Sequence, residues 1–224
     1  MSIPNITTAS YPDLYEHLET IAGAVKVAAS SARSNPMLTP AGQIDALRAQ
    51  DTRAGWTADV DAIEAELGRR IDAAAQAKAA AAPAPLAAGD VAGELRALRF
   101  WTRTRPVLDR ADSPRSAVIQ MIESCGDADL GTAIEEAPAY LESNGIRDGA
   151  KLIDEAVFHR SPAMQAAHAD GLHAQTMRNS AFRGLLGHVR EMLATAAPIT
   201  PNAVVFKLAQ VQSMDAERTY YRAA

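Results

Sequence analysis

A Ser or Thr followed directly by Pro occurs at four well-separated places in the chain. The pairs are Thr39-Pro40, Ser113-Pro114, Ser161-Pro162 and Thr200-Pro201. The Ser or Thr side chain can cap a free backbone N–H in the first turn of a helix, and Pro suits the first helical position because it has no N–H to leave unpaired. The four pairs therefore predict four helix starts, which indicates a chain built from helices.

Composition also favours helices over sheets. About a fifth of the 224 residues are alanine, the strongest helix former, and only 5% are aromatic. Residues that favour strands are sparse. The sequence therefore predicts an all-α fold, with an N-terminal hairpin of long helices followed by a C-terminal bundle of several helices.

The first predicted helix covers residues 11–33 and carries one narrow apolar stripe. Leu14, Leu18, Ile21 and Val25 follow one another at intervals of four, three and four residues. At about 100° per residue these side chains lie on one face of the helix. Such a seam is typical of a helix that packs closely on another helix. One hypothesis is that this stripe binds a partner molecule.

The apolar positions change phase within the next helical stretch, residues 40–81. Ile44 and Leu47 define one face, and a second set that begins at Trp56 defines another, rotated by roughly 160°. Either the helix breaks near Asp51-Thr52, or its two halves bury opposite faces against different neighbours. We favour the break, but the face of Trp56 is a second candidate for partner binding.

An Ala-rich segment with two prolines, Pro83 and Pro85, ends this stretch. Residues 83–89 are predicted to form a stiff linker of small residues. We therefore expect two domains, an N-terminal helical hairpin at 1–82 and a C-terminal helical bundle at 90–224.

Two further helices are predicted near the C-terminus. The first starts at Ser161-Pro162 and extends as far as Pro198, and the second starts at Thr200-Pro201. Residues 203–208, AVVFKL, favour a strand by propensity alone. Because no partner strand is evident in the sequence, we expect a helix there.

The densest cationic segment of the chain is LRALRFWTRTRPVLDR, which contains five arginines and Asp109 as its only acid. Arg96, Arg99 and Arg103 are three and four residues apart, so on a helix they form one basic edge. Such an edge can simply face solvent, contact an acidic protein partner or bind nucleic-acid phosphate. A solvated face is the simplest interpretation, and nucleic acid is the least favoured because nothing in the segment would read bases.

No motif predicts catalysis, a metal site or a cofactor. A Gly-rich phosphate loop, a Gly-x-Ser-x-Gly motif and a zinc signature are all missing from the sequence. His168 and His173 are five residues apart, whereas a helical two-histidine zinc site uses a spacing of four. Paired acids such as Asp59 and Asp61 are interpreted as surface carboxylates. The single Cys125 excludes an intramolecular disulfide and is expected to be a buried, inert thiol. We therefore expect a protein that is not an enzyme, with no catalytic residue, metal or cofactor.

Charge and hydropathy give no reason to expect a membrane. The formal net charge of −5 is mild and does not favour nucleic-acid binding along the whole chain. The sequence lacks a run of about 18 apolar residues. Its first residues, MSIPNITTAS, lack the basic start and apolar stretch of a secretory signal. We expect a protein that has no membrane partner and stays in the cytoplasm where it is made.

Two stretches resemble a known group of proteins. ARSNPMLTPAGQIDALRA resembles the NP-x-LT-x-x-G segment of small structural proteins of tailed bacteriophages with high-GC hosts. LRALRFWTRTRPVLD, followed by AIEEAPAYLESNG, is similar to the RxxRxWxRxxPxLD … LPAYL pattern of the same group. The resemblance assigns no catalytic residue.

This resemblance implies a non-enzymatic virion protein of the head or head–tail region, which is assembled in the host cytoplasm. Its partners would be other virion proteins, capsid or connector subunits, and it would be oligomeric within that assembly. Two alternatives stay open: a capsid scaffold or assembly chaperone, and a small nucleic-acid-associated regulator.

Overall fold

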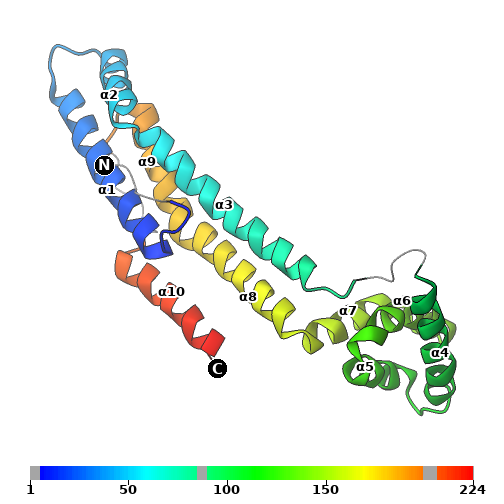
Figure 1. Ribbon diagram of the computed structural model, residues 1–224. Helices are drawn as coiled ribbons and strands as arrows, with labels where there is room; N and C mark the ends of the chain where they lie inside the picture. Colours follow the sequence, from blue (N-terminus) through cyan, green and yellow to red (C-terminus); the bar gives the residue numbers. More distant parts are fainter. Residues whose placement is uncertain (1–5, 85–89, 199–205, 224) are drawn as a thin grey trace. The chain divides into compact units, whose positions relative to one another are not determined.

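The computed structural model describes residues 6–84, 90–198 and 206–223, with side chains as far as residue 216, and every regular element in these ranges is a helix (Figure 1). The predicted all-α fold class is therefore confirmed. The N-terminal part begins with long helices, as the sequence predicts. In chain order the elements are α1 (Tyr11–Ser34), α2 (Pro40–Ala54), α3 (Trp56–Ala80), α4 (Val91–Leu108), α5 (Pro114–Ser124), α6 (Asp127–Ser143), α7 (Gly149–Arg160), α8 (Pro162–Thr176), the π-helical segment η1 (Met177–Phe182), α9 (Arg183–Thr195) and α10 (Leu208–Ala223).

Three of the four predicted helix starts lie where the Ser/Thr-Pro pairs place them. At each start the side-chain oxygen accepts a hydrogen bond from the backbone N–H three residues further on: Thr39 at 3.2 Å, Ser113 at 3.3 Å and Ser161 at 3.2 Å. These bonds satisfy donors that the first turn of a helix leaves free. The fourth pair, Thr200-Pro201, lies outside the described residues, as does the first half, 203–205, of the segment for which a strand was weighed.

The break predicted near Asp51-Thr52 lies a few residues later, at Gly55. This glycine has φ +75°, in the left-handed region, and separates α2 from α3. Glycine is suited to this position because it has no Cβ to penalise a positive φ. Asp51 stabilises the start of α3 after this break, since its carboxylate accepts hydrogen bonds from the backbone N–H and the hydroxyl of Thr57 at 2.8 and 2.6 Å. The change in apolar phase therefore marks a helix boundary.

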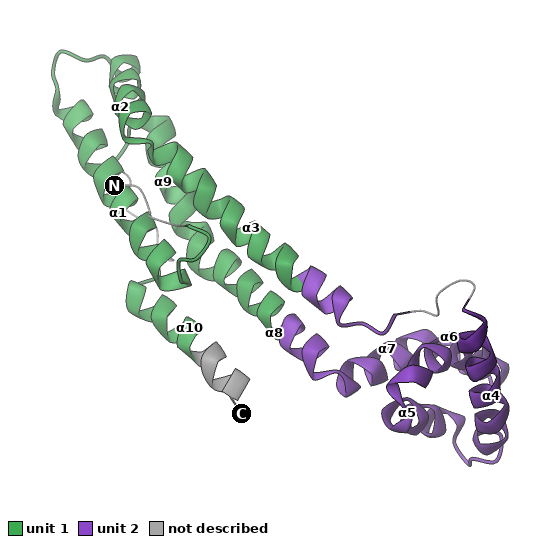
Figure 2. Ribbon diagram, in the orientation of Figure 1, with its two compact units in different colours: residues 1–74, 169–224 green, residues 75–168 purple. Residues whose placement is uncertain are grey.

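The helices form two compact units that do not match the predicted division at the linker. Unit 1 comprises residues 1–74 and 169–224, and unit 2 comprises residues 75–168 (Figure 2). The last quarter of the chain thus packs with the N-terminal helices instead of completing a C-terminal bundle. Sequence order suggested contiguous domains, but the apolar faces of α9 and α10 fit α1.

The core of unit 1 joins α1, α3, η1, α9 and α10. The predicted stripe of α1 lies in it, together with the apolar face of α9 and the buried end of η1. Residues of this core that are buried on these elements include Leu14, Leu18, Ile63, Leu67, Met177, Phe182, Leu185, Val189, Met192 and Val211. A smaller cluster beside it packs α2 against α1 through Leu47 and Ala29.

Unit 2 has its own core, formed by α4, α5, α6 and α7. Its central residues are buried on all four helices: Leu108, Val118, Ile122, Leu141, Leu152 and Ile153. The end of α3 belongs to this unit because Lys78 Nζ lies 5.5 Å from the centre of the Phe158 ring of α7. Ala84, four residues past the end of α3, is also close to this unit, since a Cβ on Gly131 of α6 would lie 3.1 Å from the Ala84 carbonyl oxygen.

Candidate interaction surface

The apolar stripe of α1, one of the predicted partner-binding surfaces, is buried inside unit 1. Leu14, Leu18 and Val25 have no exposed surface, and Ile21 is 3% exposed. The stripe packs against this chain's own helices, chiefly α9 and α10. The sequence correctly indicated a close helix–helix seam, but its assignment to another molecule is wrong for this fold. These residues stabilise unit 1.

The face of Trp56, the second predicted partner-binding surface, is also buried within unit 1. Trp56 is partly buried and packs against both apolar clusters of unit 1. Val60, Ile63 and Leu67, which follow it on the same face of α3, are almost fully buried. This face is therefore also part of the core and is not a free surface.

The third predicted surface, the basic edge of α4, does face outward. Arg96, Arg99 and Arg103 are all exposed. Across the described part of the chain, none of the three forms an ion pair. We refer to these three residues as the Arg edge. Its charge is not neutralised within the part of the chain that the structure shows.

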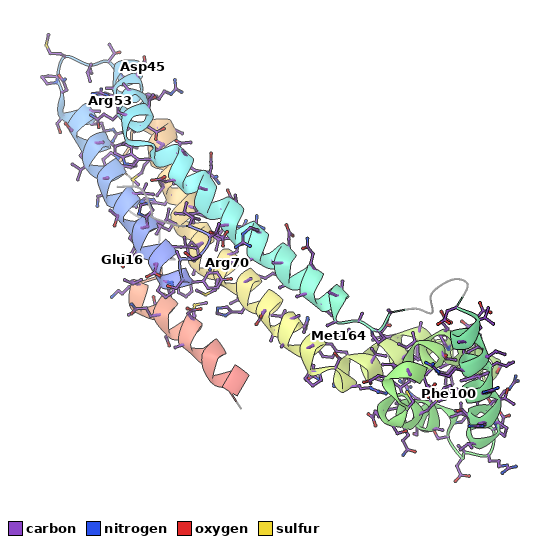
Figure 3. All side chains as sticks on the ribbon, in the orientation of Figure 1. Glu16, Asp45, Arg53, Arg70, Phe100 and Met164 are labelled. Carbon is purple, nitrogen blue, oxygen red and sulfur yellow. The ribbon has the colours of Figure 1, made fainter. Side chains whose placement is uncertain are left out.

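Packing and capping fix the orientation of α4 on unit 2. Asp90 caps the helix, with its carboxylate accepting from Gly93 N–H at 2.9 Å. Leu108 is buried, and Trp101 meets the Tyr140 ring of α6 edge-on with the ring centres 6.1 Å apart. Phe100, labelled in Figure 3 among the side chains of unit 2, is partly buried against the same core. These contacts use one side of α4 and leave the opposite side open.

The open side carries an apolar stripe that the sequence analysis did not single out as a surface. Val91, Leu95 and Leu98 are 65%, 50% and 64% exposed. Their intervals of four and three residues place them within about 60° of one another around the helix. We call these residues the outer stripe. The signal was partly present in the sequence, because the stripe is centred about 90° or more around the helix from Trp101 and Leu108, although Leu98 lies only three residues from Trp101.

The Arg edge and Leu95 of the outer stripe line an open groove of about 710 Å³ between α4 and the start of α6. We call it the α4 groove. Its lining combines the three guanidinium side chains with Leu95, Phe100 and Thr104 of α4, and with Ala128 and Asp129 of α6. Asp129 is the only acid among these lining residues, so the groove is cationic with apolar walls.

The charge of α4 is opposite to that of the chain. The helix contains four arginines and one glutamate, whereas the whole chain has a formal net charge of −5. Arginine forks bind carboxylate and phosphate groups through paired hydrogen bonds. An exposed helix that presents both arginines and leucines can bind an anionic partner that also has apolar surface.

A second groove of unit 2, of about 490 Å³, lies beside α7 and has its charges largely engaged within the chain. Lys151 pairs with Glu155 at 3.8 Å, and Lys78 lies over the Phe158 ring. His168 contacts the same ring edge-on at 5.4 Å. These contacts engage the charged and ring groups just named, whereas Asp154, which also lines the groove, is not part of them.

Two of the three histidines of unit 1, His17 and His173, also have partners within the chain. His173 Nε2 lies 3.0 Å from Asp215 Oδ1, and His17 Nε2 lies 3.4 Å from Asp59 Oδ2. Each pair links helices that are distant in the sequence, α8 with α10 and α1 with α3. Within the described ranges, no group of three or more His, Cys, Asp or Glu side chains is arranged to hold a metal ion.

Cys125 differs from its expected environment. It is partly exposed instead of buried, and its thiol faces the Ile122 carbonyl at 3.6 Å. Arg160 Nη1 donates to its sulfur at 3.2 Å, and Arg160 Nη2 donates to Asp127 at 2.6 Å. The guanidinium therefore ties the junction of α5 and α6 to the end of α7.

No helix in the described ranges is long and apolar enough to cross a membrane. Comparisons of the chain with protein-family models, with curated protein sequences and with solved structures found no match. The exposed face of α4, with its outer stripe and Arg edge, is the candidate interaction site of the described chain.

Proposed function

We propose that this chain is a non-enzymatic structural protein of a tailed-phage virion, which acts by helix-mediated contact with a neighbouring virion protein in the head or head–tail region. The observation that supports this proposal most directly is the open face of α4. Leu98 and Val91 expose about two thirds of their surface beside three arginines that form no ion pair with any acid in the described ranges. Exposed apolar surface of this kind is typical of a contact site for another molecule.

The resemblance to small phage structural proteins supplies the biological setting of the proposal. One of its two stretches, LRALRFWTRTRPVLD, contains most of the exposed face of α4. The same stretch thus carries both the resemblance and the candidate contact surface. The resemblance implies capsid or connector subunits as the neighbours.

Mass spectrometry of purified particles tests this proposal. Virions of the phage that encodes the chain, and procapsids from a packaging-defective mutant, would be analysed separately. We expect peptides of this chain in mature virions at a fixed ratio to the major capsid protein. Absence from virions and procapsids would overturn the proposal, whereas presence in procapsids alone would identify the alternative, a scaffold or assembly chaperone.

The unpaired Arg edge also supports a second candidate, a nucleic-acid-associated regulator. Such a protein would bind duplex DNA with an affinity that falls steeply as salt rises, because phosphate binding releases counterions. Replacing Arg99 and Arg103 by alanine would weaken that binding and reduce its salt dependence. An affinity that does not change in this double variant would reject the regulator.

A further inference from the structure

We infer that the open face of α4 binds an acidic amphipathic helix of the partner protein, and this inference rests on the proposed contact function. The partner helix would lay an apolar ridge on the outer stripe of α4. Its carboxylates would point into the α4 groove and meet the Arg edge. The juxtaposition that carries the inference is a line of exposed leucine and valine beside a parallel line of unpaired arginines.

The spacing of the two lines matches the surface of another helix. Leu95 and Leu98 are three residues apart, and so are Arg96 and Arg99, while Val91–Leu95 and Arg99–Arg103 are four apart. Side chains on a packed helix recur at the same intervals, so ridges of one helix fit grooves of the other. A partner with apolar residues at such intervals and acids on the adjacent face would satisfy both lines at once.

The outer stripe also distinguishes a protein partner from nucleic acid. A phosphate backbone could bind Arg96, Arg99 and Arg103, but it offers nothing apolar to cover Leu98, which is 64% exposed. Burial of apolar surface is a main source of affinity in protein association. A partner that covers leucines and pairs arginines therefore fits this face better than DNA or RNA does.

An anionic membrane surface fits less well for a different reason. Helices that lie in a membrane interface commonly place Trp or Phe on the side that enters the lipid. In α4 the two large aromatic residues, Phe100 and Trp101, pack instead against the core of unit 2. The outward side offers only Val91, Leu95 and Leu98, a narrow stripe suited to one neighbouring helix.

The probe that tests this inference is a synthetic alanine-based peptide of about 20 residues, long enough to form a helix. Leucines at intervals of four and three residues form its ridge, and glutamates occupy the adjacent face. A control peptide of identical composition carries the glutamates on the face opposite the leucines. Binding of each labelled peptide to the full-length chain is measured by fluorescence anisotropy.

We expect the designed peptide to bind with a Kd of the order of 10 μM, as suits a small interface. The control peptide should bind at least about tenfold more weakly, because its acids cannot reach the Arg edge while its leucines contact the stripe. Equal binding of the two peptides would overturn the inference, since the charge register would then have no role.

Two double variants locate the binding face. Arg99→Ala with Arg103→Ala, and Leu95→Ser with Leu98→Ser, should each weaken binding of the designed peptide about tenfold or more. The first has a matched control in Arg110→Ala with Arg147→Ala, which removes two other exposed arginines of unit 2. Circular dichroism verifies that all variants keep the helical content of the parent chain.

The leucine pair has its own control in unit 1. Met37→Ser with Leu172→Ser removes two exposed apolar side chains that are 88% and 51% exposed and remote from α4 in the sequence. Both control variants should bind the peptide within about twofold of the parent. Equal losses in the control and test variants would overturn the assignment to α4.

Vesicles of phosphatidylcholine with phosphatidylserine, and a duplex DNA, complete the test in the same buffer. We expect both to bind more weakly than the designed peptide at physiological salt. Tighter binding of either one, lost in the Leu95/Leu98 or Arg99/Arg103 variant, would overturn the inference in favour of that ligand.

The two proposals fail separately. A chain that is present in virions but ignores the peptide would refute this inference alone. A chain that binds the peptide through α4 but is absent from all particles would refute the proposed virion role alone.

Discussion

Replacing the buried Glu66 by glutamine should destabilise unit 1 without altering its fold. Glu66 is 4% exposed, and its carboxylate accepts three hydrogen bonds of 2.7 Å, two from Arg69 and one from Arg70. Arg70, labelled in Figure 3, also donates to the Ala9 carbonyl and lies over the Tyr11 ring at 4.6 Å. The carboxylate thus organises a network that holds the start of α1 to α3.

The size of the effect follows from what glutamine can and cannot replace. Its amide has one acceptor oxygen and no charge, so it loses at least one of the charge-assisted hydrogen bonds, each of which contributes about 1.5–3 kcal/mol. Arg69 can turn to solvent because its side chain is 54% exposed, which reduces the penalty of leaving it unpaired. We therefore expect Glu66→Gln to lower the free energy of unfolding of unit 1 by about 2 kcal/mol.

Urea denaturation followed by tryptophan fluorescence measures this loss. The chain has two tryptophans, Trp56 in unit 1 and Trp101 in unit 2, so a Trp101→Phe background reports on unit 1 alone. With a slope of about 2 kcal/mol per M urea, the midpoint should fall by about 1 M. The control is Asp45→Asn, which breaks an exposed ion pair of 3.7 Å with Arg48 and should cost less than about 0.5 kcal/mol.

The same variant should change how stability depends on pH. Burial on its own raises the pKa of Glu66, but hydrogen bonds from Arg69 and Arg70, and their charges, outweigh it and hold the pKa below the ordinary value of 4.5. The unfolded chain therefore binds this proton at a higher pH than the folded chain does. The stabilisation is complete above pH 4.5 and is lost as the pH falls through the folded-state pKa.

Glu66→Gln should accordingly lose less stability than the parent below pH 4.5. A urea midpoint of the variant equal to the parent's at pH 7 would contradict a stabilising role for this network. A parallel loss of stability in the parent and the variant, as the pH falls through this range, would contradict the lowered pKa of Glu66.

Three further experiments test other parts of the structure. In thermal denaturation, Leu18→Ala should lower the stability of unit 1 by about 3 kcal/mol, whereas Leu98→Ala should change that of unit 2 by less than about 0.5 kcal/mol, because only Leu18 is buried. Similar thermal shifts in the two variants would contradict the placement of Leu18 in the core and Leu98 at the surface. Gly55→Ala should lower the free energy of unfolding of unit 1 by about 1 kcal/mol in urea denaturation, because alanine disfavours φ +75°, although no atom lies within 4 Å of the added Cβ. An unchanged midpoint would show that the positive φ does not require glycine. Arg160→Ala should lower the stability of unit 2 by about 1–2 kcal/mol, because the Arg160 guanidinium donates to three groups at the junction of α5 and α6. The exposed control Arg147→Ala should leave the urea midpoint of unit 2 unchanged, and equal midpoint shifts in the two variants would contradict this role of Arg160.

Local features of the fold could be predicted from the sequence because their causes are local. Thr39, Ser113 and Ser161 cap helices through hydrogen bonds that span three residues, so their neighbours alone determine them. The stripe from Leu14 to Val25 also follows from spacing within one helix. In each case the residues that determine the feature lie within a few helical turns of one another.

The pairing of helices could not be predicted in the same way. The stripe of α1 packs against α9 and α10, which lie more than a hundred residues later, and no periodicity encodes which apolar face it meets. A narrow seam can be satisfied equally well by the same chain or by another molecule. For this reason the spacing correctly predicted that these residues form a packing surface, but the prediction that they bind another molecule was wrong, because they pack against helices of the same chain.

The candidate site was half visible in the sequence. Arg96, Arg99 and Arg103 were found from their spacing, since three like charges on one helix face are costly to bury and are therefore expected at the surface. The outer stripe was missed because α4 has two apolar faces, and only the packing of Trp101 and Leu108 shows which one unit 2 uses. An exposed leucine cannot be told from a buried one until the neighbouring helices are placed.

The interrupted order of unit 1 constrains how the chain can reach its native state. Residues 1–74 leave the ribosome first, but their core partners in 169–224 are synthesised only after all of unit 2 has been made. Until then the leucines of α1 lack the part of their native cover that α9 and α10 supply, whereas unit 2 has every residue of its own core once residue 168 has been made. Translation thus favours unit 2 folding first, and a nascent chain stalled near residue 168 would be exposed to aggregation or to a chaperone that shields α1.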